Sequence, residues 1–211
     1  MIHSASLVHH TSNGDDLIAY MARVSNPANQ DNPNNSKLIQ YLIKHKHWSP
    51  FEMVNMCVEI STTRSIAAQI LRHRSFSFQE FSQRYASVDK LGDAVFPALR
   101  RQDEHNRQNS IDDIGENCKT EWYKEIDKLY KQSRKLYESM LNAGIAKECA
   151  REVLTLSSPS KLYMNGTLRS WIHYVELRSA NGTQQEHRTI ALKIKDLLKQ
   201  NFPKTYKAVF E

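Results

Sequence analysis

The segment Met53–Leu71, MVNMCVEISTTRSIAAQIL, carries the clearest local signal for the fold. Up to Thr62, apolar and polar side chains alternate, which is typical of a strand with one buried face. From Thr63 onward the apolar residues recur at helical spacing, so the strand is expected to lead directly into a helix. Residues 72–85, RHRSFSFQEFSQRY, follow that helix at once and hold three arginines. The chain therefore places a polar, arginine-rich segment beside a predicted core strand.

The sequence before this segment predicts one strand and two helices. Ile2–His9 is expected to form a short edge strand, and a helix is expected from Asp15 to Val24, with acidic residues in its first turn. Residues 26–35 hold five asparagines and two prolines, which favours a loop. Ser36 is then expected to cap a helix over residues 37–46.

The sequence after this segment is mainly helical in pattern. Ser110–Asn142 gives the longest helical signal, and its apolar side chains recur at three- and four-residue spacing: Trp122, Ile126, Leu129, Leu136, Tyr137 and Met140. A strand is predicted over Lys161–Asn165, and helices over Thr167–Leu177 and Gln184–Gln200. The sum is a helix-rich α/β (α+β) fold with few strands, expected to form a single domain over residues 1–211.

Composition excludes several classes of protein. The 211 residues are 25% charged, and no apolar run approaches the ~20 residues of a membrane helix. The N-terminus lacks the pattern of a signal peptide. Three cysteines without a CxxC pair argue against a disulfide framework or a zinc site, so no metal is expected. We expect a reducing, cytoplasmic location. The net charge of +6 fits an anionic partner: a nucleotide, a phosphorylated cofactor or a nucleic acid.

Residues 72–85 suggest how a nucleotide could be bound. Guanidinium groups offer paired donors to phosphate oxygens, whereas Glu80 suits a sugar hydroxyl or an imide N–H. Arg72 and Arg74 would point about 200° apart on a helix, so if both serve one ligand, either the helix ends near His73 or the ligand wraps around it. A solvated or salt-bridged arginine face is the alternative. The phenylalanines of this segment fit core packing better than stacking on bases.

The spacing of this segment resembles a known family. Arg72-His73-Arg74, seven residues, Ser82, one residue and Arg84 form the RHRx7SxR signature of flavin-dependent thymidylate synthases. Further matches occur in the family's order: the turn His47–Glu52, the helix Ala150–Leu154, Arg169, and Leu177-Arg178 followed by Gln184 and Glu186. Ordered matches run from about residue 45 to residue 190.

The resemblance implies an activity and an assembly. Members of this family convert dUMP to dTMP with 5,10-methylenetetrahydrofolate as methylene donor and FAD, reduced by NADPH, as hydride source. Their fold is an α/β homotetramer with a small central sheet, and their active sites lie at subunit interfaces. No membrane or nucleic-acid partner is implied.

The resemblance also implies site residues. Arg178 corresponds to the catalytic arginine that favours ionisation at N3 of the uracil, a role in which a fixed cation stabilises charge on the ring. The residues expected to bind dUMP are Gln69, Arg72, Glu80, Ser82, Arg84, Arg151 and Arg178. Those expected to bind FAD are Ser49, Arg72, His73, Arg74, Glu80, Thr167, Arg169 and His173.

Some residues depart from the family pattern. Gln79 and Thr167 replace frequent asparagines, and Gly182 stands near a position where some members have histidine. His187 is expected to be a surface histidine. Cys57 lies within the predicted core strand, so no thiol nucleophile is expected. Two alternative functions remain: a flavin- and folate-dependent uracil methylase acting on RNA, and a nucleic-acid-binding module.

Overall fold

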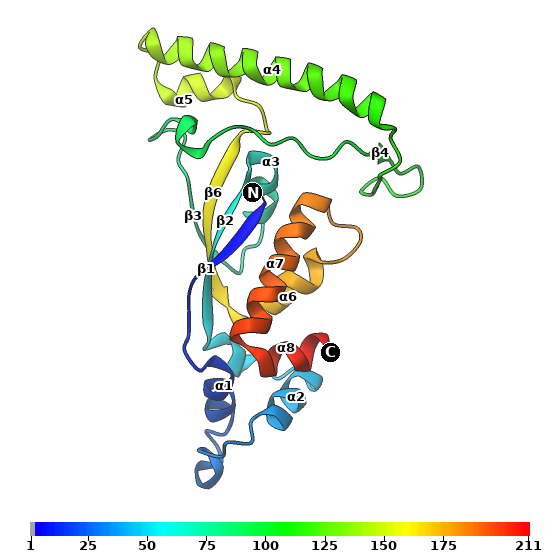
Figure 1. Ribbon diagram of the computed structural model, residues 1–211. Helices are drawn as coiled ribbons and strands as arrows, with labels where there is room; N and C mark the ends of the chain where they lie inside the picture. The colour runs from blue at the N-terminus through cyan, green and yellow to red at the C-terminus, as the bar shows by residue number, and fades with distance from the viewer. Residues whose placement is uncertain (1–2) are drawn as a thin grey trace.

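Two long strands form the centre of the sheet. The computed structural model describes residues 3–211, and in it β2 (Asn55–Thr63) pairs antiparallel with β6 (Pro159–Thr167) over nine residues of each strand. The outer strands β1 (Ser4–His10) and β3 (Ser77–Glu80) complete an antiparallel sheet in the order β1-β2-β6-β3 (Figure 1). The predicted edge strand is therefore confirmed, although Ile2 lies outside the described residues.

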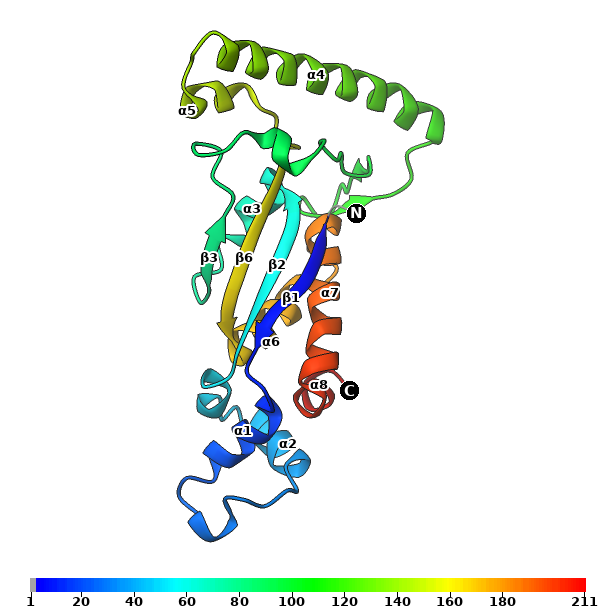
Figure 2. The ribbon, with the colours of Figure 1, turned by 60° about the vertical axis from the view of Figure 1, so that its left-hand side comes forward.

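The alternation along β2 and β6 gives the sheet two different faces. Val58 and Leu162 point into the core and are fully buried. The opposite face carries polar side chains, among which Tyr163 and Lys161 both contact Glu59. Figure 2 shows helices on one side of the sheet and none across the side that faces the viewer. A helix-rich α/β fold with a small antiparallel sheet is thus confirmed.

Eight α-helices accompany the sheet within residues 3–211. They are α1 (Gly14–Ala22), α2 (Ser36–Lys44), α3 (Arg64–Ile70), α4 (Glu116–Asn142), α5 (Lys147–Ala150), α6 (Leu168–Arg178), α7 (Gln185–Asn201) and α8 (Pro203–Phe210). A minor hairpin joins β4 (Arg101–Gln102) to β5 (Ser110–Ile111). No helix in this part of the chain is long and apolar enough to cross a membrane.

Helix α6 is fixed to the sheet by one large side chain. Trp171 is fully buried, and its indole N–H donates to the carbonyl of Met56 at 2.9 Å. Phe76 packs edge-on against Trp171 and lies over Gly166 in β6, where a Cβ atom would approach the Phe76 ring to 2.4 Å. Glycine at position 166 therefore allows the segment after α3 to lie close to the sheet.

Helix α4 is the main departure from expectation. It begins at Glu116 rather than Ser110, and it stands away from the sheet (Figure 1). Tyr137, fully buried, and Tyr130 anchor it, whereas Trp122, Leu129 and Leu136 are 61%, 61% and 50% exposed. The predicted apolar stripe exists, but within the described chain nothing covers these three side chains.

Three local expectations are corrected. The residue that precedes α2 is Asn35, and its side chain donates to Asp16 instead of capping the helix, while Ser36 is already helical. The four-residue strand β3 was not predicted. Helix α8 was not predicted either; Pro203 stands in its first turn, where proline is favoured.

Candidate functional site

The end of α6 and the turn after α3 meet at the candidate site. Arg178, the last residue of α6, donates from Nε to Nε2 of His73 at 2.9 Å. Burial, then the charges of Arg178 and His173, lowers the pKa of His73 to about 4, so at neutral pH its ring accepts this bond uncharged. Helix α3 ends at Ile70, before the arginine motif, which agrees with the first of the two arrangements considered for Arg72 and Arg74. The structure thus brings Arg178 into contact with His73, the central residue of the Arg72–Arg74 motif.

A buried polar layer lies beneath this contact. The Tyr174 hydroxyl lies 3.0 Å from Nε2 of His187, and Nδ1 of His187 lies 3.2 Å from Oε1 of Gln69. His187 is fully buried, so the expectation of a surface histidine was wrong. Its position three residues before Ile190 places it on the apolar face of α7. Burial, then the charges of Arg178 and His73, lowers its pKa to about 3.

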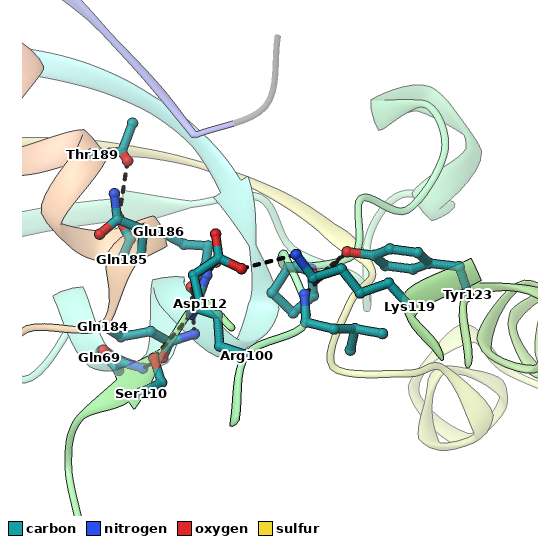
Figure 3. Close-up of polar contacts among 12 residues, drawn as sticks. Gln69, Arg100, Ser110, Asp112, Lys119, Tyr123, Gln184, Gln185, Glu186 and Thr189 are labelled. Carbon is teal, nitrogen blue, oxygen red and sulfur yellow. Dashed lines mark hydrogen bonds and ion pairs between the residues drawn. The ribbon is translucent and has the colours of Figure 1, made fainter. Parts of the chain in front are cut away.

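The polar layer continues to an ion pair that the sequence did not indicate. Gln69 donates to Gln184 at 2.7 Å, and Gln184 donates to Glu186 at 2.9 Å. Arg100, from the loop before β4, holds both carboxylate oxygens of Glu186 at 2.9 and 3.0 Å (Figure 3). Burial raises the pKa of Glu186, but the hydrogen bonds that it accepts and the Arg100 charge outweigh burial and lower it. Both side chains are largely buried.

A second part of the site is a cavity of about 550 Å³ beside the start of α6. Three residues predicted to contact FAD, Thr167, Arg169 and His173, line it. It is also lined by Trp48, Glu52, Ser75, Ser170, Ile172 and Glu176, none of them predicted. Ser49 is exposed at the start of the adjacent 3-10 turn and is not among the lining residues.

Glu52 organises the donors of this cavity. Its carboxylate accepts from the Thr167 hydroxyl at 2.8 Å and from Arg169 at 2.7 Å. Burial raises the pKa of Glu52, yet these two hydrogen bonds and the Arg169 charge together lower it. The Thr167 hydroxyl also accepts from the backbone N–H of Ser170 and so caps α6. The threonine that replaces the frequent asparagine therefore keeps a polar role here.

Ser82 and Arg84, the second half of the arginine motif, line a different cavity from the start of α6. Arg84 pairs with Glu148 of α5 at 3.0 Å, and both side chains are more than half exposed. Ser82 and Arg84 line a shallow cavity of about 330 Å³ with Lys147 and Glu148. Arg151 pairs with its neighbour Glu152 at 3.4 Å. Within residues 3–211, none of the three predicted dUMP residues Ser82, Arg84 and Arg151 contacts Arg178 or Gln69 by hydrogen bond or ion pair.

Glu80 and the two exposed arginines complete the predicted set. Glu80 accepts from Arg64 at 2.5 Å and from the Ser160 hydroxyl at 2.7 Å, so its carboxylate is held by its own chain. Arg72 and Arg74 are exposed and make no ion pair with any described residue. Their guanidinium groups are therefore open to an anion.

Comparisons with known proteins agree with one another. The family described as "Thymidylate synthase complementing protein" matches residues 6–204. A "Probable flavin-dependent thymidylate synthase" of Paramecium bursaria Chlorella virus 1 is 52% identical over 204 residues, covering 96% of this chain and 94% of the relative. A flavin-dependent thymidylate synthase of Synechocystis is 53% identical over 190 residues, covering 90% and 86%.

A solved structure is also similar to this chain. A UMP/dUMP methylase from Streptomyces cacaoi, bound with 5-Br dUMP, superposes with a TM-score of 0.86 at 25% identity. The match covers 97% of this chain and 93% of the methylase. The similarity thus extends over almost the whole length of both proteins.

Proposed function

Because this chain belongs to the family of flavin-dependent thymidylate synthases, we propose that it converts dUMP to dTMP with 5,10-methylenetetrahydrofolate as methylene donor and NADPH-reduced FAD as hydride source. The contact between Arg178 and His73 is the observation that best supports this reaction. Within the described residues, only Nε of Arg178 makes a hydrogen bond, so both terminal nitrogens remain for a ligand. A neutral His73 beside it leaves the arginine charge uncompensated.

Arg178 can activate the pyrimidine. A fixed cation beside the uracil N3 stabilises the ring anion that forms when N3 loses its proton. That negative charge is delocalised to C5, which becomes the nucleophile towards the methylene donor. The protein then needs no thiol at C6, and Cys57 is buried with its pKa raised by burial. The two remaining cysteines, Cys118 and Cys149, are exposed.

The cavity beside α6 fits a flavin nucleotide. Trp48 offers an aromatic face, while Arg169, His173, Thr167 and Ser170 offer donors for phosphate and ring oxygens. Arg169 and His173 are one helical turn apart and so lie on one face of α6, the helix that ends at Arg178. When bound, FAD supplies the hydride, and α6 positions it beside the pyrimidine. Arg72, Arg74 and Ser49 are proposed as further FAD contacts.

The dUMP phosphate is proposed to bind Ser82 and Arg84, with Arg151 and Glu80 nearby. Gln69 and Arg72 are proposed to contact the same nucleotide. Ser82 and Arg84 line a different cavity from Thr167 and His173 in the single chain, which supports sites completed by a second copy. The exposed stripe of Trp122, Leu129 and Leu136 on α4 repeats every seven residues, as in helices that pair with other helices. A homotetramer is therefore proposed, as is a cytoplasmic location.

One assay tests the reaction. Purified protein should carry a flavin spectrum, and NADPH oxidation should depend on dUMP and yield dTMP in the presence of 5,10-methylenetetrahydrofolate. Arg178→Ala should retain FAD but lose dTMP formation, whereas Arg107→Ala, an exposed arginine of the β4–β5 loop, should leave turnover unchanged. The same assay is repeated with UMP in place of dUMP, to test whether the protein also methylates a ribonucleotide. Near-normal turnover of Arg178→Ala would refute its catalytic role.

A second measurement tests the assembly. Leu129→Gln should weaken the oligomer in light scattering after gel filtration, because it places an amide in the α4 stripe. Lys131→Gln lies about 200° round the same helix and is the matched control. A Leu129→Gln protein with unchanged mass at all concentrations would exclude the stripe as an interface.

A further inference from the structure

A row of polar side chains lies beneath Arg178, and of its members only Gln69, proposed to bind dUMP, has been given a part in the reaction. It runs from Tyr174 through His187 to Gln69, with heavy-atom separations of 3.0 and 3.2 Å. It then passes through Gln184 to the carboxylate of Glu186, with separations of 2.7 and 2.9 Å. Tyr174 and His187 are fully buried, and the charged end is clamped by Arg100.

The carboxylate at one end fixes the direction of every hydrogen bond in the row. An ionised Glu186 can only accept, so the Gln184 amide must donate to it and must use its oxygen to accept from Gln69. Gln69 then has only its oxygen to offer His187, so Nδ1 of that ring carries the proton. The unprotonated Nε2 accepts from the hydroxyl of Tyr174. A single neutral tautomer of His187 satisfies the whole row.

The outcome is an amide with one orientation. Gln69 is held at its oxygen by His187 and at its nitrogen by Gln184, and each of these atoms keeps one further hydrogen-bonding position for a ligand. A glutamine without such partners can turn its amide over and present either a donor or an acceptor. We propose that His187 and Gln184 are positioning residues that hold the Gln69 carboxamide in the orientation that dUMP requires.

This proposal rests on the proposed function, in which Gln69 binds dUMP, and on two independent features of the row. The low pKa of His187 keeps positive charge out of the row at neutral pH. The bidentate bond between Arg100 and Glu186 holds the other end, because both partners are largely shielded from water. The end of the row that faces the loop before β4 is thus held by two charge-assisted hydrogen bonds.

Paired variants separate positioning from folding. His187→Asn keeps an amide N–H close to the place of Nδ1, whereas His187→Gln carries its amide toward Tyr174 and loses the donor to Gln69. Gln184→Ala removes the other partner of Gln69 at an exposed position, where the fold tolerates the change. Gln185→Ala, the next residue, alters an exposed side chain outside the row (Figure 3) and is the matched control.

Equilibrium dialysis with dUMP and steady-state kinetics should rank the variants in the same order of dUMP affinity. One lost hydrogen bond corresponds to a roughly fivefold change, so His187→Gln and Gln184→Ala should each raise the Kd and KM for dUMP about fivefold, with kcat and FAD content retained. His187→Asn and Gln185→Ala should stay within about twofold of the parent protein. A purely structural role would lower stability without distinguishing asparagine from glutamine.

Two results would overturn the proposal, and a third would concern the reaction alone. Unchanged dUMP affinity in Gln184→Ala, or equal affinities in His187→Asn and His187→Gln, would refute positioning by these residues. A parent protein that binds dUMP but forms no dTMP would refute the proposed function instead. Equilibrium dialysis measures dUMP binding without turnover. A failure of the positioning proposal can therefore be distinguished from a failure of the proposed function.

Discussion

Lowering the pH from 7 to 5 should destabilise this protein more than it destabilises the His187→Asn variant. In the native chain the pKa of His187 is about 3, because burial and then the charges of Arg178 and His73 disfavour its protonated form. In the unfolded chain the ring titrates at its ordinary value of 6.5. Between these values the unfolded chain binds a proton that the native chain does not. The free energy of unfolding therefore falls as the pH falls.

The size of the effect follows from the ordinary pKa. At pH 5 the medium is about 1.5 units below the value of the unfolded ring, which corresponds to roughly 2 kcal/mol. The result does not depend on how far below 5 the native pKa lies. His73, with a native pKa of about 4, adds a loss of similar size. The parent protein should therefore lose about 4 kcal/mol from these two histidines and His187→Asn about 2.

Denaturant titration followed by tryptophan fluorescence measures this difference, with fully buried Trp171 as a reporter of the core. All samples need one protein concentration, because an oligomer is stabilised by its own concentration. Carboxylates titrate equally in both proteins and cancel in the comparison. Equal losses of unfolding free energy in the parent and the variant would refute a buried, neutral His187.

Three further changes test other features. Gly166→Ala should cost about 2 kcal/mol of stability, because its Cβ would meet Phe76 at 2.4 Å, whereas Gly182→Ala, with open space around it, should cost nothing by thermal unfolding. Arg84→Ala should weaken dUMP binding about tenfold, with FAD affinity unchanged in parallel titrations; equal losses would contradict separate sites. Replacing all three cysteines should leave dTMP formation measurable, and complete loss in a folded protein would restore a thiol mechanism.

The long elements of the fold were predictable because their periodicity is strong. The strands β1, β2 and β6 and the helices α6 and α7 lie close to their predicted ranges. A helix end before Arg72 was one of the two arrangements expected if Arg72 and Arg74 serve one ligand, and α3 does end at Ile70. The four residues of β3 were too few for a pattern, and only the pairing with β6 makes them a strand.

The candidate site was predictable where it depends on motifs and unpredictable where it depends on packing. His187 could have been recognised as buried, because residues 187, 190, 191 and 194 form one apolar face of α7. The ion pair between Arg100 and Glu186 joins a loop to a helix across 86 positions of sequence, and no local sequence pattern predicts such a pair. The exposed stripe of α4 shows the opposite case: the apolar pattern is present as predicted, but within the described residues no side chain covers it.

The separation of Arg84 from Arg178 has a consequence for mixtures of subunits. Where one complete centre draws Arg178 from one polypeptide and Arg84 from another, two variants that are each impaired at a different arginine can complement each other. Subunits that carry Arg178→Ala, reassembled in equal amounts with subunits that carry Arg84→Ala, would restore both arginines in about one centre of every four. A centre built within one polypeptide would yield no such recovery.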